Sequence, residues 1–457
     1  MRETINLPEA FLARMKRMLG TEYEDFLASY EQERAYGLRR NPLKASATQF
    51  EETMPFTLEP VSWAQEGYYY KPSEQPGRHV LHEAGAYYIQ EPSAMAVVEI
   101  LNPQPKECIL DLCAAPGGKS TQIAGRMKGE GLLVSNEIIA SRAKILSQNI
   151  ERMGIGNCVV CNETPERMAA FFPAFFDRIV VDAPCSGEGM FRKDEAAVDE
   201  WSEAHVDMCA DRQYGILTEA VRMLKPGGVL VYSTCTFAPA ENEALISKFL
   251  REHEELMIEE VAHDVAFTRG RRDWCEMPAE GIEHTMRLMP HRLRGEGHYI
   301  ARLRRRGTLP EHCVKADSGA GAMREFLTKE IGLSADWLQR HGGVVQAFGE
   351  QIYLVPKAMI SMKGMKVLRA GLHLGTDRKN RIEPAHALAL ALNIEETDRT
   401  MELTEQEAER YLHGESLPCT SQKGWTLLTY MGYPLGFGKA VNGQMKNHYP
   451  KGLRRQT

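Results

Sequence analysis

The chain has 457 residues, more than a single hydrophobic core usually holds, so we expect two to four domains. Its 43% hydrophobic and 26% charged residues are typical of a globular protein, and no run of about 18 apolar residues suggests a membrane span. The net charge of −7 argues against a protein that coats nucleic acid with its whole surface.

The N-terminal segment MRETINLPEAFLARMKRMLG predicts an amphipathic helix with charges throughout, without the uninterrupted apolar core of a signal peptide. Ten cysteines in such a chain are typical of reduced thiols in a cytosol. We therefore expect a cytoplasmic monomer that makes no contact with a membrane.

Residues 1–100 predict a small α+β domain. Apolar residues recur at helical spacing between Pro8 and Tyr36, and the segments GLRRNPLK and EGYYYKP predict strands and loops. From Cys108, five β-rich runs each precede a helical segment: CILDLC, LLVSNE, CVVCN, RIVVDAPC and GVLVYSTC. This alternation predicts a parallel sheet with helices on both faces, within residues 101–306.

The composition changes again after Arg306. The segment GAMREFLTKEIGL begins a second predicted α+β domain, over residues 307–380. The glycine- and aromatic-rich GWTLLTYMGYPLGFGKAVNG predicts a small β-barrel-like module within residues 381–457.

The segment CILDLCAAPGGKSTQIA predicts a strand, a tight turn and the start of a helix. A phosphate-binding P-loop would need glycine where Cys113 stands, and a G-x-G-x-x-G dinucleotide motif is missing too. Small residues at the carboxyl end of a strand let a ligand approach the backbone. Glu137 ends the next strand, where a carboxylate accepts from ribose hydroxyls. The pattern favours a ligand that contains a nucleoside; a plain glycine turn is the alternative.

Two apolar runs end on a thiol, VVDAPCSGEGMF at Cys185 and LVYSTCTF at Cys235. These are the fourth and fifth predicted strands, and neighbouring strands lie about 5 Å apart. A single cysteine at a strand end is often simply buried. Two cysteines at equivalent strand ends, one of them after Asp-Ala-Pro, favour a catalytic role.

Covalent catalysis on cytosine would use such a thiolate beside a nucleoside cofactor. Addition to carbon 6 makes carbon 5 nucleophilic, carbon 5 takes a methyl group from a sulfonium donor, and a base then removes its proton. Asp182 could assist at ring nitrogen 3; its alternative is a turn cap. The chemistry alone leaves open which thiol attacks.

Five segments resemble the NOL1/NOP2/Sun family of RNA cytosine-5 methyltransferases, and within it the bacterial enzymes of 16S ribosomal RNA: QEPSAM, DLCAAPGGKS, NEIIASRAKILSQNIERMG, DAPCSGEGMFRKD and YSTCTFAPAENE. The C-terminal GFGKAVNGQMKNHYPKGLRR resembles the PUA-like end of those enzymes. The resemblance implies an α/β fold, with a Rossmann-like S-adenosylmethionine-dependent methyltransferase core. An RNA-binding α+β domain would precede this core, and an α+β and PUA-like RNA-binding region would follow it.

The resemblance also implies roles for single residues. Cys235 would be the nucleophile, as the Thr-Cys partner and the missing ENV motif favour the RNA family over DNA methyltransferases, which use the Pro-Cys thiol. Cys185 would assist proton removal, Asp182 would bind the target base or the cofactor, and Lys119 would lie between the two. The donor S-adenosylmethionine would be held by Cys113, Ala114, Ala115, Pro116, Gly117, Gly118, Glu137, Arg142 and Asn162. Asn162 stands in CNETP, where the family often has an acid.

The implied partner is ribosomal RNA or the small ribosomal subunit. The cluster Arg302–Arg306 and the acid-free tail Lys439–Arg455, with Phe437 and Tyr449 as aromatic residues, would contact phosphates; solvated charged faces are the alternative. Cys158 and Cys161 have CxxC spacing without a second pair, so strand packing rather than a metal site is expected. A transfer RNA methyltransferase and a non-catalytic ribosome assembly factor remain alternative functions.

Overall fold

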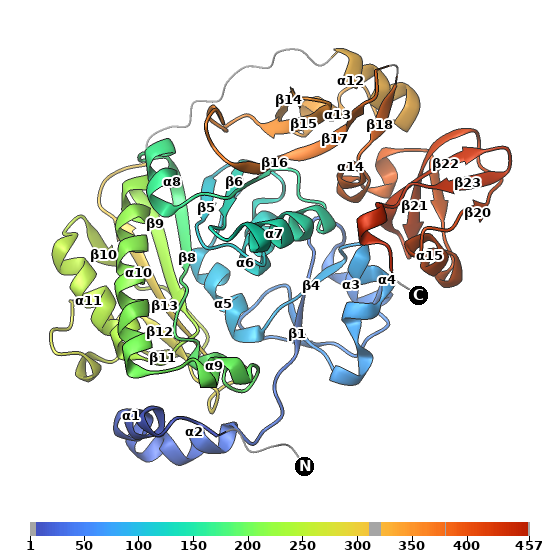
Figure 1. The fold of residues 1–457 in the computed structure, drawn as a ribbon. Helices are drawn as coiled ribbons and strands as arrows, with labels where there is room; N and C mark the ends of the chain where they lie inside the picture. Colours follow the sequence, from blue (N-terminus) through green and yellow to red (C-terminus); the bar gives the residue numbers. More distant parts are fainter. Residues whose placement is uncertain (1–5, 310–320, 380, 456–457) are drawn as a thin grey trace.

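The computed structural model describes residues 6–309, 321–379 and 381–455. These residues form four β-sheets, one of them a central ten-stranded sheet between two helical layers. Figure 1 shows the N-terminal helices below this sheet, and the C-terminal sheets beside the edge that the strand Val367–Ala370 forms. In the described residues, no helix is both long and apolar enough to cross a membrane.

The first elements are the helices α1 (Glu9–Leu19) and α2 (Tyr23–Ser29). Phe11 of α1 packs 5.1 Å from Phe191, and Phe26 of α2 packs 5.5 Å from Phe237, measured between ring centroids. These helices therefore cover the two loops that carry the thiols. A four-stranded antiparallel sheet follows in the order β2-β3-β1-β4, formed by Glu59–Pro60, Gly67–Tyr69, Gly37–Arg40 and Tyr87–Ile89, with α3 (Ala47–Thr53) and α4 (Val80–Glu83).

The central sheet has the order β11-β12-β13-β9-β8-β5-β6-β7-β16, and β10 pairs with β13. The strands that the sequence predicted run parallel: β5 (Cys108–Asp111), β6 (Leu132–Asn136), β7 (Cys158–Cys161), β8 (Phe176–Asp182) and β9 (Leu224–Thr234). The chain moves outward in opposite directions from β5, so the ligand-binding crevice of such a fold is expected at the carboxyl end of β5.

Helices cover both faces of this sheet, because successive strand residues point to opposite sides. Ile109 packs on one face, against α5 (Pro92–Leu101), α6 (Gly118–Met127) and α7 (Ala140–Arg152). Leu110 packs on the other face, against α8 (Pro165–Phe171), α10 (Glu203–Met223) and α11 (Glu243–Glu252). The predicted Rossmann-like fold class is confirmed. The further elements are α9 (Glu195–Asp199) and the antiparallel strands β10 (Leu256–Ile258), β11 (Thr268–Arg269), β12 (Met286–Leu288) and β13 (His298–Arg305).

The C-terminal α+β region is joined to the central sheet by one strand, β16 (Val367–Ala370), which pairs antiparallel with β7. The rest of this region is a four-stranded sheet in the order β14-β15-β17-β18, preceded by α12 (Gly321–Phe326) and α13 (Trp337–Arg340). Its strands are Gly343–Phe348, Gln351–Pro356, Leu372–Asp377 and Ile382–Pro384.

The last module is a five-stranded sheet in the order β19-β21-β22-β23-β20. Its long hairpin joins β21 (Gly424–Tyr430) to β22 (Tyr433–Val441), as expected for the β-rich end of the chain. The other elements are α14 (His386–Ala391), β19 (Thr400–Glu402), α15 (Glu405–Leu412), β20 (Leu417–Pro418) and β23 (Gln444–Asn447).

Candidate active site at the carboxyl ends of the central strands

The two thiols of the sequence motifs lie side by side. Asp182 at the end of β8 pairs in register with Ser233 of the parallel neighbour β9, so the loops after these strands leave the sheet together. The sulfur atoms of Cys185 and Cys235 are 3.3 Å apart. A disulfide bond measures about 2.05 Å, so both thiols are free, and both are partly exposed to solvent.

The environment distinguishes the two thiols. The hydrogen bond to Cys235 is the largest cause that raises the pKa of the Cys185 thiol well above its ordinary value; burial and repulsion between the two sulfur charges raise it further. Burial alone would lower the pKa of Lys119, but Asp182, Asp111 and the thiol of Cys235 together raise it. The ammonium group of Lys119 therefore lies near the sulfur of Cys235.

Asp182 is the centre of a charged cluster beside the thiols. Its carboxylate accepts hydrogen bonds from Nζ of Lys119 at 2.5 Å and from Oγ of Ser233 at 2.7 Å. Although burial pushes the pKa of Asp182 upward, Lys119 and His298 hold it well below its ordinary range, so the carboxylate is ionised. Its partners among the described residues are side chains rather than backbone N–H groups, which does not fit the turn-cap alternative.

The two thiol loops are held by buried carboxylates that the sequence did not single out. Glu241 accepts from the backbone N–H and the hydroxyl of Ser186, the residue after Cys185. Glu188 is fully buried and accepts from Arg14 at 2.5 Å, from the indole N–H of Trp201 and from the backbone N–H of Phe237. Helix α1 is thus bonded to the Cys185 loop, and Glu188 bonds that loop to the Cys235 loop.

The glycine loop is held by residues from the next helices and from the N-terminal domain. Arg142 donates to the carbonyl of Ala115 at 2.9 Å, and its guanidinium lies 3.6 Å from the carboxylate of Glu137. Gly117 has φ +118°, a conformation that favours glycine. Arg39 of β1 donates to the carbonyl of Gly118 at 3.0 Å. The loop residues predicted to line the donor therefore form one rigid turn beside Glu137.

Some predicted ligand groups are already engaged by the protein. Asn162 donates both amide protons, to the carbonyls of Glu137 at 2.7 Å and Ile138 at 2.8 Å, so only its Oδ1 atom is left for a ligand. The neighbouring carboxylate of Glu163 accepts from Arg167 at 2.7 Å and from the backbone N–H of Lys366. Thr164 caps α8.

The hydrogen-bonding groups of this site fit an S-adenosyl ligand. Glu137 is a buried acceptor at the end of β6, where ribose hydroxyls would donate. Asp111 at the end of β5 has a buried Oδ1 atom without a donor in the described residues, and burial raises the pKa of its carboxyl group to about 7. The ammonium group of an S-adenosyl ligand would donate the hydrogen bond that this oxygen lacks. In the described part of the chain, no cluster of His, Cys, Asp and Glu has the arrangement of a metal site.

His298 belongs to this site but was missed by sequence reasoning. It begins β13, an antiparallel strand next to β9, and its Nε2 atom lies 3.7 Å from Oδ1 of Asp182. The imidazole is buried, and Nε2 makes no hydrogen bond within the described structure. The segment GEGHYIARL does not predict this placement. The placement depends on the pairing of β13 with β9, and His298 stands more than 60 residues after Cys235 in the chain.

Three arginines of the basic run Arg302–Arg306, which was predicted to contact phosphates, are engaged within the protein. Arg302 and Arg304 of β13 both donate to the carboxylate of Glu259, and Arg305 donates to the carbonyl of Leu224. Because alternate strand residues share a face, this acid collects both guanidinium groups. In the C-terminal tail, Phe437 and Tyr449 are buried and cannot stack on a base, whereas Lys446 and Lys451 are exposed.

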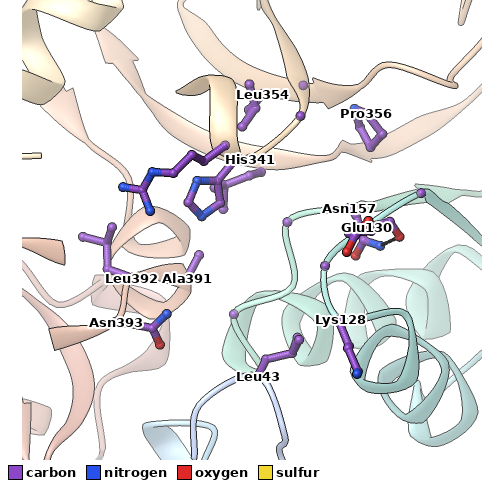
Figure 2. Close-up of a pocket in the computed structure, with 18 of the residues that line it drawn as sticks. Leu43, Lys128, Glu130, Asn157, His341, Leu354, Pro356, Ala391, Leu392 and Asn393 are labelled. Carbon is purple, nitrogen blue, oxygen red and sulfur yellow. Dashed lines mark hydrogen bonds between the residues drawn. The ribbon is translucent and has the colours of Figure 1, made fainter. Parts of the chain in front are cut away.

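A cavity of about 530 Å³ lies at the amino ends of the same strands, between the central sheet and the C-terminal domains. Figure 2 shows Asn157 and Glu130 on one side and His341, Leu354 and Leu392 on the other. Ligands of open α/β sheets bind beyond the carboxyl ends of the strands, so the thiols rather than this cavity mark the candidate active site.

Comparison with known proteins agrees with this geometry. A family model described as 16S rRNA methyltransferase RsmB/F matches residues 98–304. Three further models match the N-terminal domain of 16S rRNA methyltransferase RsmF at 7–92, the RsmF first C-terminal domain at 326–392 and the RsmF PUA domain at 398–455. The ribosomal RNA small subunit methyltransferase F of Vibrio parahaemolyticus is 33% identical, over 100% of this chain and 99% of its own. The chain belongs to the RsmB/F family of 16S rRNA methyltransferases.

Other relatives show the same relationship. The methyltransferase F of Klebsiella pneumoniae is 33% identical over 99% of this chain and 97% of its own. A solved methyltransferase homolog from Pyrococcus horikoshii shares 25% identity with a TM-score of 0.58, covering 66% of this chain and 96% of its own. The structure of NSun6 from Pyrococcus horikoshii with SFG has a TM-score of 0.57 at 20% identity, over 67% of this chain and 100% of its own, which shows a shared fold. The resemblance proposed from the five motifs is thus confirmed, and the chain is a methyltransferase with a PUA domain.

Proposed function

We propose that this chain acts in the cytoplasm and transfers a methyl group from S-adenosylmethionine to carbon 5 of a cytosine in 16S ribosomal RNA. The observation that carries the proposal is the pair of free thiols, 3.3 Å apart, beside the ionised pair of Lys119 and Asp182. Pure RNA binding needs none of these groups. Bound S-adenosylmethionine would supply an electrophilic methyl group on a sulfonium ion.

Cys235 would be the nucleophile. The ammonium group of Lys119 lies beside this thiol, whereas the raised pKa of Cys185 keeps that thiol protonated. The Cys235 thiolate would form a bond to carbon 6 of the cytosine, which makes carbon 5 nucleophilic toward the methyl group. The ionised carboxylate of Asp182 would accept hydrogen bonds from the exocyclic amine or a protonated ring nitrogen of the base.

Cys185 would complete the reaction. The contact with Cys235 is the largest cause of its raised pKa, and that contact loses its charge once Cys235 is bonded to the base. The pKa of Cys185 then falls, its proton leaves to solvent, and its thiolate can remove the proton from carbon 5. Loss of this proton breaks the bond between the Cys235 sulfur and carbon 6, which releases the methylated RNA.

Glu137 and Arg142 would hold the ribose, Asn162 would accept from the adenine amine through Oδ1, and residues 113–118 would line the donor. RNA would also contact the N-terminal domain and the PUA domain, whose exposed Lys446 and Lys451 are available for phosphates. The test is methylation with labelled S-adenosylmethionine of naked 16S ribosomal RNA, assembled small subunits and transfer RNA, followed by mapping of 5-methylcytosine. Label in transfer RNA alone would favour the transfer RNA alternative, and no label in any of them would favour an assembly factor.

A further inference from the structure

A groove of about 520 Å³ lies beside the thiol loops, and nothing in the proposed reaction uses it. It is formed by residues 32–36 between α2 and β1, residues 70–72 after β3, residues 290–295 before β13, and Arg192 from the Cys185 loop. We propose that this groove binds a nucleotide that flanks the target cytosine in a single-stranded segment of the RNA. This inference rests on the proposed function and adds a second contact point for the same substrate.

The charge of the groove fits an RNA backbone. Its cationic side chains are Arg34, Lys71, Arg192, Arg292 and Arg294, and the acid among its lining residues is Glu33. In the described part of the protein, no acid forms an ion pair with Arg34 or Lys71. Arg292 and Arg294 pair with Glu22 and Glu59 at the surface.

The ion pair between Arg294 and Glu59 is easily exchanged. The side chains of Arg294 and Glu59 are 58% and 64% exposed, and such pairs contribute little to stability. A phosphate can therefore replace the carboxylate at small cost. Arg192 is different: its side chain is only 7% exposed, donates to Glu296 and to the carbonyls of Ser29 and Gly295, and holds the wall of the groove in place.

Two aromatic rings fit the bases of such a segment. The rings of Tyr36 and Tyr70 are partly exposed and lie 5.9 Å apart, and the guanidinium of Arg34 lies 5.5 Å from the centre of the Tyr36 ring. A cationic groove with exposed aromatic rings is the usual binding surface for single-stranded RNA, because every base can stack on such a ring.

One loop lies between the groove and the thiol site. Arg192 follows Cys185 in the same loop, and Gly189 of this loop donates its N–H to the carbonyl of Cys235 at 2.7 Å. Gly189 also lies against Glu296 and Gly297, directly after the groove residue Gly295. One loop is thus the shared wall of both sites, so a strand with its cytosine at Cys235 passes into the groove.

The test compares methylation kinetics of Arg34→Ala/Tyr36→Ala with those of Arg378→Ala/Phe348→Ala, a matched pair of exposed residues on the β14-β18 sheet. The groove variant should raise KM for an RNA fragment by about tenfold, equivalent to about 1.4 kcal/mol, without changing kcat or KM for S-adenosylmethionine. Tyr36→Phe should restore most of the affinity, because it keeps the ring. Removal of Arg34 should reduce the slope of log affinity for RNA against log salt concentration by about 1, because one phosphate contact is lost.

Equal KM values for the groove variant and the control would overturn the groove proposal. Direct binding of the same RNA fragment, measured without cofactor, separates this outcome from failure of the proposed function. If the wild type binds RNA through the groove but methylates none, only the proposed function fails. If methylation proceeds with unchanged RNA affinity in the groove variant, or the groove captures an acidic peptide in preference to RNA, only the groove proposal fails.

Discussion

Glu188 connects the N-terminal helix to the thiol loops, and its replacement by glutamine tests that connection. The carboxylate accepts three hydrogen bonds and is fully buried. Oε1 accepts from Arg14 and Trp201, and Oε2 accepts from Phe237, so either orientation of a glutamine amide would place an NH₂ group against a donor. The change also leaves the guanidinium of Arg14, 15% exposed, without its charge partner.

The expected cost follows from burial. Removal of one partner from a buried ion pair costs about 3–5 kcal/mol. The matched control is Glu350→Gln, which breaks a 2.8 Å pair with Arg378 whose side chains are 59% and 51% exposed. That change should cost less than about 1 kcal/mol. Because Gly189 next to Glu188 bonds to the Cys235 carbonyl, Glu188→Gln should also lower kcat by about tenfold or more.

Hydrogen exchange of the Phe237 amide measures the local effect, since its N–H donates to Glu188. We expect exchange at Phe237 to become at least about a hundredfold faster in Glu188→Gln and to remain unchanged in Glu350→Gln. Similar exchange rates at Phe237 in both variants would refute the reasoning, because the buried carboxylate would then not hold the loop.

Three further predictions concern the titrating groups of the site. Cys235→Ala should lower the pKa of Cys185 toward its ordinary value, and faster alkylation of Cys185 by iodoacetamide at pH 8 than in wild type checks this; an unchanged rate would contradict the assigned cause. His298→Phe removes one of the groups that lower the pKa of Asp182, so the acid limb of the kcat/KM profile should move to higher pH, and an unmoved limb would exclude the contact. Burial raises the pKa of Asp111 from about 3.8 to about 7, so the stability that this group contributes is complete below about pH 4 and is lost as the pH rises to 7. Denaturation curves should therefore show Asp111→Asn gaining stability relative to wild type over that range. A constant difference between the two proteins would contradict the shift.

Much of the site could be predicted because its motifs are local. The glycine loop and the two thiols each follow a strand directly, so a strand-turn-helix pattern places them at one edge of the sheet. The order of the strands from β9 to β7 follows from the general rules of such folds, and it brings Cys185 and Cys235 together.

The parts that could not be predicted depend on pairing between distant segments. His298 reaches Asp182 because β13 pairs antiparallel with β9, and Arg14 reaches Glu188 because α1 packs on the thiol loops. The arginines of β13 look like a phosphate site in the sequence. Their acid partner, Glu259, stands more than 40 residues earlier, and only the structure shows the pair.

The covalent role of Cys235 is the central claim, and one measurement tests it most directly. Cys185→Ala, incubated with 16S ribosomal RNA and S-adenosylmethionine, should accumulate a protein–RNA adduct that survives denaturation, because this variant lacks the base that we propose for product release. Mass spectrometry should locate the RNA on Cys235, and Cys235→Ala should form no adduct. An adduct that forms in Cys235→Ala and maps to Cys185 would contradict the account.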